Sequence, residues 1–285
     1  MKAHPECKDC LKNMINQVAL TFPKKKDKIK VKEIGLALLD KEFSLDLSSP
    51  VIANRIYHKI RTIFNINDPF RSFKDREISM AKAIIPYISE QNLSFRKAIE
   101  LAVIGNNIDF FKDIDSVKNQ ISNDQKKGIK FYKDDIDILK EMIKKRKGTI
   151  LYLADNTGEA FFDIFFYKKL STYGHKVIYV VKGGPALNDI TLDDLERGEI
   201  NKHFENIIST GLDEVGIDIN RSSEEFRQAL KESFLIISKG MANFETLTED
   251  KLSIPTFYLL KIKCTPVSKN LSLPKDEYIA LLKEN

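Results

Sequence analysis

The spacing of apolar residues changes near Gly148, and this change constrains the fold more than any other feature of the sequence. Before Gly148 the apolar residues recur every three or four positions, which is the spacing that buries one face of a helix. After it they form short, nearly continuous runs, which are typical of parallel strands buried on both faces. We therefore divide the 285 residues into a helical region, 1–147, and an α/β region, 148–285, and expect the two to pack as one compact unit.

Two segments of the helical region show the helical spacing most clearly. The first begins near Cys10 and places four apolar residues on one face: Leu11, Met14, Ile15 and Val18. The second begins with Ser49-Pro50, and proline is favoured in the first turn of a helix. It carries an isoleucine every three or four positions: Ile52, Ile56, Ile60 and Ile63. We predict roughly five to seven helices in this region and no strand.

Five apolar runs after Gly148 are candidate strands. They span Thr149–Ala154, Lys176–Val181, Asn206–Thr210, Phe234–Ser238 and Thr256–Lys263. Helical segments separate them, and one of these is expected to begin with a capping box formed by Ser222 and Glu225. Repeated strand–helix–strand units form a parallel sheet covered by helices. The predicted fold class is therefore α/β, with a three-layer α/β/α, doubly wound, mainly parallel sheet preceded by an all-helical N-terminal region.

Polar residues follow the ends of four predicted strands. In open parallel sheets, ligands bind beyond the carboxyl ends of the strands, so residues from these positions are expected to converge. The first strand is followed by an acid and an amide, the second by a lysine, two glycines and an Asn-Asp pair, and the fourth by a lysine, a glycine and an asparagine. The fifth carries a lysine near its end. These residues are Asp155, Asn156, Lys182, Gly183, Gly184, Asn188, Asp189, Lys239, Gly240, Asn243 and Lys263.

The residue types at these strand ends suit a divalent cation and a phosphate group. The carboxylates of Asp155 and Asp189 and the side-chain carbonyl of Asn156 are oxygen ligands that Mg²⁺ or Mn²⁺ accepts. Lysines and exposed backbone N–H groups suit phosphate. A metal with few protein ligands keeps positions open for water and a phosphoryl oxygen. The Asp-Asn pair taken alone is typical of a turn or a helix cap, so the metal interpretation depends on the convergence.

Several common sites are excluded by the absence of their motifs. The chain has no G-x-G-x-x-G, no G-x-x-x-x-G-K-[ST] and no G-x-S-x-G, and its four histidines are scattered. The net charge of +5 is a small excess, and the basic runs Lys24–Lys32 and Lys140–Lys147 are not interleaved with aromatic residues. We therefore expect no nucleic-acid partner.

The sequence also carries no sign of a membrane segment or an export signal. No apolar run approaches the ~20 residues that a membrane-spanning helix needs. The segment MKAHPECKDC has no apolar stretch of the signal-peptide kind, so we expect no membrane partner and a cytoplasmic location.

The three cysteines are too few for a disulfide framework. Cys7 and Cys10 form a single C-x-x-C motif, which without a second pair is a weak zinc signal. We interpret them as structural thiols at the start of a helix. A disulfide, or a metal site completed by a fourth ligand, remains the alternative, and redox catalysis is not expected.

Three motifs resemble those of a known family. YLADNTGEAFFD, VVKGGPALNDIT and SKGMANFETL resemble the central motifs of the metal-dependent damage-control phosphatases, a family long known as domain of unknown function 89. The family includes acidic-residue methyltransferase-like proteins and a domain fused to some pantothenate kinases. The segments CKDC, GNNIDF (105–110) and LLKIKC resemble its small archaeal members. The resemblance covers essentially the whole chain, and the motifs occur in the family's order.

The resemblance implies a site as well as a fold. It implies an α/β/α domain preceded by a helical region, and a divalent metal, commonly Mn²⁺, Co²⁺, Ni²⁺ or Mg²⁺. By similarity Asp155, Asn156 and Asp189 are the metal ligands, and the two aspartates are also the catalytic residues. The implied substrate or phosphate contacts are Glu159, Asn188, Lys239, Asn243 and Lys263. The chain departs from some subfamilies at Leu260-Lys261, where those have Arg-Thr.

The expected activity is hydrolysis of phosphate monoesters of small metabolites by metal-activated water. The family's substrates imply damaged or surplus phosphometabolites, such as sugar phosphates or oxidised pantetheine phosphates. An S-adenosylmethionine-dependent carboxyl methyltransferase is the first alternative, although the chain lacks the glycine-rich loop and ribose-binding acid expected for that cofactor. A non-catalytic protein that binds a phosphorylated ligand is the second.

Overall fold

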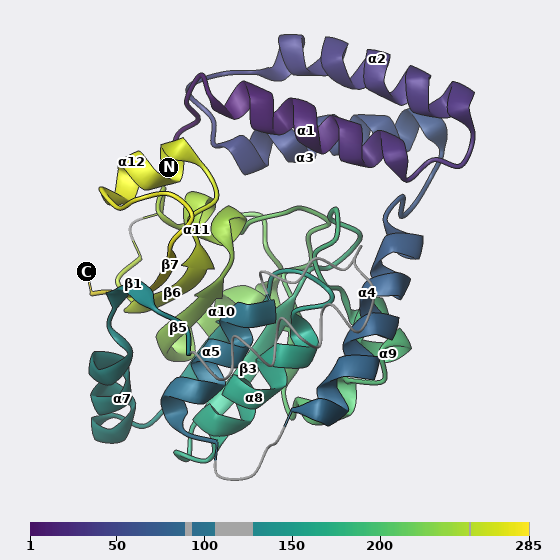
Figure 1. The fold of residues 1–285 in the computed structure, drawn as a ribbon. Helices are drawn as coiled ribbons and strands as arrows, with labels where there is room; N and C mark the ends of the chain where they lie inside the picture. The colour runs from purple at the N-terminus through teal and green to yellow at the C-terminus, as the bar shows by residue number, and fades with distance from the viewer. Residues whose placement is uncertain (89–92, 106–127, 251, 285) are drawn as a thin grey trace.

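The computed structural model describes residues 1–88, 93–105, 128–250 and 252–284. Its centre is a seven-stranded sheet with the strand order β1-β7-β6-β5-β2-β3-β4 (Figure 1). The strands are β1 (Phe131–Asp134), β2 (Thr149–Leu153), β3 (Lys176–Val181), β4 (Ile207–Ser209), β5 (Ser233–Lys239), β6 (Thr256–Lys261) and β7 (Tyr278–Lys283). The prediction of an α/β fold is confirmed.

The path of the chain through the sheet creates a switch point between β2 and β5. Strands β6, β5, β2, β3 and β4 run parallel, while β7 pairs antiparallel with β6 and parallel with β1. From β2 the chain moves outward to β3 and β4, then returns to β5 on the other side of β2. Loops that follow β2 and β5 therefore leave the same edge in opposite directions, and in such sheets this is the place where ligands bind.

Helices cover both faces of the sheet, as the three-layer prediction requires. One buried cluster joins the sheet to α4, α5, α7 and α8, and a second joins its other face to α10, α11 and α12. The bounds in the α/β part are α5 (Phe95–Gly105), α7 (Ile136–Lys145), α8 (Ala160–Ser171), α9 (Leu192–Arg197), α10 (Glu224–Glu232), α11 (Met241–Leu247) and α12 (Thr265–Leu271). Short 3₁₀ turns occupy Ile85–Tyr87 and Asn201–His203.

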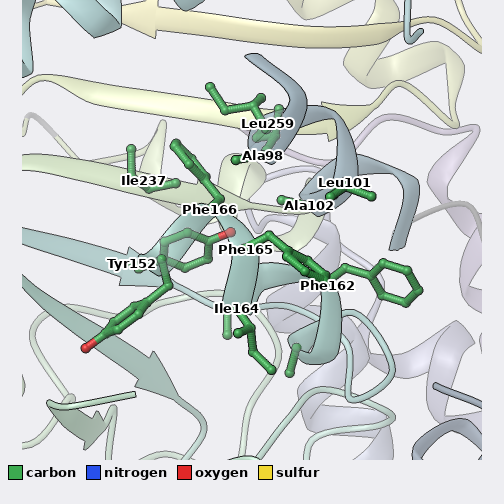
Figure 2. Close-up of a cluster of buried hydrophobic side chains, with 14 of the residues drawn as sticks. Ala98, Leu101, Ala102, Tyr152, Phe162, Ile164, Phe165, Phe166, Ile237 and Leu259 are labelled. Atoms are coloured by element: carbon green, nitrogen blue, oxygen red, sulfur yellow. The ribbon is translucent and has the colours of Figure 1, made fainter. Parts of the chain in front are cut away.

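Helix α8 is apolar nearly all round because it lies between two layers. Figure 2 shows Phe166 directed toward the side chains of Tyr152, Ile237 and Leu259 of the sheet, while α5 lies along α8 through Ala98, Leu101 and Ala102. A helix buried on every side needs no polar face, which accounts for the run AFFDIFFY at the start of α8. This packing fixes the helix that follows the Asp155-Asn156 turn.

The first three helices form a layer of their own at one end of the molecule (Figure 1). They are α1 (Cys7–Leu20), α2 (Lys25–Glu42) and α3 (Ser49–Phe64), and α4 (Arg71–Ile84) leads from them to the sheet. The predicted face of α1 is buried, as are the first three isoleucines of α3, but Ile63 is 51% exposed. No helix in the described ranges is both long enough and apolar enough to span a bilayer.

The prediction of an all-helical region before Gly148 is wrong at one place. Strand β1 lies at the outer edge of the sheet and buries only Phe131 of its four residues, so it leaves no apolar run in the sequence. Together with α7 it packs on the sheet although it precedes the predicted boundary. Strand β7 was also not predicted. The expected capping box is absent: the N-cap of α10 is Ser223, whose hydroxyl accepts from the backbone of Phe226.

Candidate active site

Two loops that the sequence places far apart are joined by backbone hydrogen bonds at the sheet edge. Asp155 and Asn156 follow β2, and Asp189 lies in the loop after β3. The N–H of Ile190 donates to the carbonyl of Asp155 at 2.9 Å, and Asn156 and Asp189 form an isolated antiparallel bridge. The fold therefore brings the three predicted metal ligands together.

The two aspartates of this site are buried, and burial raises the pKa of both carboxyl groups. Burial, the charge of Glu159 and the charge of Asp189 raise the pKa of Asp155 well above its usual value. Burial raises the pKa of Asp189 to about 6, although the ammonium of Lys182 acts in the opposite direction. The Oδ2 atom of Asp189 is buried and accepts no hydrogen bond within the described part of the chain. Its nearest cationic contact there is Lys182 Nζ, at 3.5 Å.

The amide of Asn156 is oriented by two carboxylates. Its Nδ2 donates to Glu159 Oε1 at 2.7 Å and to Asp155 Oδ2 at 3.2 Å. Because both carboxylates bind the nitrogen, the carbonyl oxygen is the part of this side chain that can face a cation. The role of Asn156 as a metal ligand stays a prediction.

Next to Asn156 lies a buried network that we call the Lys239 cluster: Lys239, Glu159, Asp163, Tyr152 and Tyr179. Lys239 is fully buried at the end of β5, and its Nζ donates to Asp163 at 2.7 Å and to Glu159 at 3.1 Å. The hydroxyls of Tyr152 and Tyr179 donate to Asp163 at 2.8 and 2.9 Å. Burial disfavours the charge of Lys239, but the two carboxylates hold its pKa above the usual range. The predicted phosphate contact at Lys239 is thus, in this structure, a buried anchor for Glu159.

Asp189 belongs to a second buried network, which we call the Lys182 cluster: Lys182, Asp189, Asn243 and the carbonyl of Gly216. Lys182 ends the run of β3 and donates from Nζ to Gly216 at 2.6 Å and to Asn243 Oδ1 at 3.2 Å. Burial lowers the pKa of Lys182, and the charge of Asp189 offsets part of this. The sequence located Lys182 at a strand end but gave it no role.

The first turn of α11, which follows β5, joins the ends of β5 and β2. Asn243 Nδ2 donates to the carbonyl of Ala154 at 3.0 Å and to that of Lys239 at 2.9 Å, which joins the ends of the two strands. Gly240 has a φ of +77°, and a Cβ there would collide with the carboxylate of Asp155. The position therefore requires glycine.

The remaining predicted residues lie at the edge of this site or outside it. Lys263 is exposed, and its charge lowers the pKa of Asp155, so it lies near this carboxylate at the protein surface. Cys7 is buried at the start of α1 in the core of the first three helices, and Cys10 is exposed; both are free thiols. The motif residues 106–110 lie outside the described residues.

The helical region contributes contacts that the sequence did not predict. Arg61 of α3 donates to the carbonyl of Pro185 at 3.1 Å and to Asp213 at 2.8 Å. Glu77 of α4 accepts from the backbone of Gly158 at 3.3 Å and from Asn188 Nδ2 at 3.4 Å. The sequence feature that could have indicated a role for Glu77 is the position of a charged residue on the buried face of a helix.

The donor set fits a small divalent cation. Among the described residues no three His, Cys, Asp or Glu side chains have metal-binding geometry. The predicted set is of a different kind, with two carboxylates and an amide oxygen. The unsatisfied Oδ2 of Asp189 and the oriented amide of Asn156 are what a cation that prefers oxygen ligands requires. The residues present therefore fit the metal that the resemblance implies.

Buried carboxylates and lysines at the switch point of a mainly parallel sheet define a class of α/β protein that binds its ligand beyond the strand ends. Comparison with known proteins narrows the class. Residues 3–279 match the family model of the damage-control phosphatase ARMT1-like domain, so the chain belongs to this family. The resemblance found in the motifs is confirmed.

Individual relatives match along their whole length. The chain is 32% identical to the damage-control phosphatase PH1575 of Pyrococcus horikoshii, over 99% of this chain and 98% of that protein. It is 29% identical to a damage-control phosphatase of Archaeoglobus fulgidus, over the full length of both. The crystal structure of PH1575, described as a DUF89 family protein, superposes with a TM-score of 0.89 and covers 99% of each chain at 31% identity.

Proposed function

We propose that this chain is a divalent-metal-dependent phosphatase that hydrolyses phosphate monoesters of small metabolites, such as sugar phosphates or damaged phosphometabolites. Membership of a family of damage-control phosphatases supports the hydrolysis. The observation that carries the metal dependence is the meeting of Asp155 and Asp189 in a buried site where Oδ2 of Asp189 has a long ion pair with Lys182, at 3.5 Å, and accepts no hydrogen bond among the described residues.

The proposed division of roles follows from the contacts. Asp155, Asp189 and the side-chain oxygen of Asn156 would hold Mn²⁺, Co²⁺, Ni²⁺ or Mg²⁺. Such a cation, when bound, polarises a phosphoryl group and lowers the pKa of a bound water. Lys263 lies near Asp155 at the protein surface, which suits a contact with the substrate phosphate.

Two further residues keep this site in shape. Glu159 is held from two sides, by the amide of Asn156 and the ammonium of Lys239, and so keeps the Asn156 oxygen turned toward the pocket. Asn243 holds the ends of β2 and β5 together beneath it.

The decisive experiment removes and returns the metal. The purified chain is stripped with a chelator, checked by circular dichroism for retained folding, and refilled with single metals. We expect hydrolysis of an aryl phosphate to disappear with the metal and to return with Mn²⁺, Co²⁺ or Ni²⁺. No hydrolysis with any metal, together with tight binding of S-adenosylmethionine, would instead identify a methyltransferase. Binding of phosphorylated ligands without turnover would identify a binding protein.

A further inference from the structure

A buried glutamate of the helical region touches both loops of the site. Glu77 lies on α4 and is 2% exposed. Its Oε2 accepts from the N–H of Gly158, in the turn that carries Asn156, and its Oε1 accepts from Nδ2 of Asn188, the neighbour of Asp189. A single carboxylate thus bridges the loop after β2 and the loop after β3.

The contact with Asn188 has a directional consequence. A side-chain amide presents a donor nitrogen on one side and an acceptor oxygen on the other. Because Glu77 accepts from the nitrogen at 3.4 Å, the carbonyl oxygen is the end of Asn188 left to face a ligand. The ionised carboxylate of Glu77 therefore favours this orientation of the amide, and burial raises the pKa of Glu77 to about 8.

The backbone around Asn188 is already fixed, so only its side chain depends on Glu77. Thr157 donates to the Asn188 carbonyl twice, from its N–H at 2.9 Å and from its hydroxyl at 3.0 Å. The lysine one turn earlier on α4, Lys74, is bound to Asp194 at 3.0 Å and to Asp68 at 3.3 Å. Within the described residues, the hydrogen bonds of Glu77 thus serve the site loops.

We propose that Glu77 is a positioning residue of the site, which orients the amide of Asn188 and steadies the turn after β2 so that oxygen atoms face the metal and substrate. The inference rests on the proposed metal-dependent function. It assigns to α4, in the helical region, a direct part in building the site.

The test reverses the direction of one hydrogen bond. In Glu77→Gln the new side chain can accept from Gly158 with its oxygen, but its nitrogen then faces the nitrogen of Asn188, which must turn its oxygen away from the pocket. We expect the Mn²⁺ dissociation constant to rise about 10- to 100-fold, the range seen when a group that orients a metal ligand is lost. In Asn188→Asp two carboxylates oppose each other above pH 8, because burial raises the pKa of Glu77 to about 8, and a similar loss is expected there.

The double variant should regain part of the Mn²⁺ affinity that each single variant loses. With Glu77→Gln and Asn188→Asp together, the glutamine nitrogen donates to the new carboxylate, whose second oxygen remains for the pocket. We expect Mn²⁺ affinity, measured by calorimetry, to exceed that of the better single variant by about tenfold, a coupling typical of residues in contact. Turnover of an aryl phosphate should follow the same order.

A matched control separates positioning from general damage. Glu100→Gln changes another buried glutamate of the helical region, which pairs with Lys97 at 2.9 Å. It should leave Mn²⁺ affinity unchanged. If Glu77→Gln does not fold, the side-chain amide of Asn188 in the wild-type protein still tests the contact by NMR. Slow exchange of its two protons with water is expected, and rapid exchange would overturn the inference.

The outcomes distinguish this inference from the proposed function. Wild-type Mn²⁺ affinity in Glu77→Gln, or a double variant no better than the two losses combined, overturns the role of Glu77 alone. A wild-type chain that binds no divalent metal overturns the proposed function. A chain that binds Mn²⁺ without hydrolysing any ester overturns the phosphatase activity, while the affinities still decide the role of Glu77.

Discussion

The Lys239 and Lys182 clusters each contain a buried lysine close to the two site aspartates, but the two lysines differ in their partners and in the direction of their pKa shift. Lys239 has two carboxylates within 3.1 Å, and their charges hold its pKa above the usual range. Lys182 has a backbone carbonyl at 2.6 Å and one carboxylate at 3.5 Å, and burial lowers its pKa. Lys239 is thus matched by two carboxylates, whereas Lys182 has one carboxylate and two neutral acceptors.

The difference indicates which side of the pocket can accept a ligand. In the Lys239 cluster each charge already has its partners, so it has little to gain from a cation or a phosphate. In the Lys182 cluster Oδ2 of Asp189 has a long ion pair with Lys182, at 3.5 Å, and accepts no hydrogen bond among the described residues. We therefore expect changes near Asp189 to affect mainly turnover, and changes near Lys239 to affect mainly stability.

The largest effect is expected from Asp189→Asn, which keeps the size of the side chain but removes its charge. If Asp189 is a metal ligand, metal affinity should fall sharply and turnover by orders of magnitude, with the fold intact. Asp155→Asn should behave alike, although asparagine would serve equally well as a helix cap. Calorimetric titration of Mn²⁺, with circular dichroism as the folding control, measures this. Unchanged affinity in both variants would show that the metal site is wrongly assigned.

The next largest effect is expected on the free energy of unfolding, and it should differ between variants of the two lysines. Lys239→Met leaves two buried carboxylates without their counter-ion, and breaking a buried pair in this way costs about 3–5 kcal/mol. Lys182→Met removes one long ion pair and the hydrogen bonds to Gly216 and Asn243, and because only one carboxylate loses its counter-ion it should cost less, about 1–3 kcal/mol. Urea unfolding of both variants without metal compares them. Equal losses would remove the distinction between the clusters.

A smaller effect is expected inside the Lys239 cluster. Tyr179→Phe removes one hydrogen bond to Asp163 at 2.9 Å and leaves the ring in place. Loss of a buried bond to a charged group should lower the free energy of unfolding by about 1.5–3 kcal/mol. Turnover per folded molecule, measured at saturating metal, should stay within a few-fold. A severe loss of turnover with normal stability would place this cluster in the chemistry.

The smallest effect on turnover should come from the thiols, which lie outside both clusters. Metal-assisted hydrolysis needs no thiol, so the double change Cys7→Ser with Cys10→Ser should leave the rate per folded molecule within a few-fold. Thermal stability should fall, mainly through Cys7, because it is buried. Melting curves alongside rates show whether this holds; an inactive but folded double variant would mean that the site lies elsewhere.

The sequence predicted the sheet side of the site because parallel topology turns chain position into spatial position. Each apolar run ends at the same edge, so Asp155 and Asp189 could be brought together without knowing any contact. Strand β1 could not be found in this way, because an edge strand with a single buried residue has no apolar run. The fold class was therefore accessible while one edge of the sheet was not.

The contribution of the helices could not be predicted from spacing. Helical periodicity shows which face is buried but not which loop that face meets. Lys74 and Glu77 lie on the same buried face of α4 as three apolar residues: Ile78, Ala81 and Ile84. Two charges on such a face are a signal of internal polar contacts, and the partners appear only when the helix is placed against the sheet.

The backbone pairing of the two site loops has a consequence for how the site opens. The N–H of Thr157 is bound to Asn188, and that of Ile190 to Asp155, so neither loop can leave the other without freeing both amides. In a hydrogen–deuterium exchange experiment these two protons should exchange at similar rates, because one shared fluctuation, the separation of the two loops, exposes both. Their exchange rates would therefore measure how often the two site loops separate when no substrate is bound.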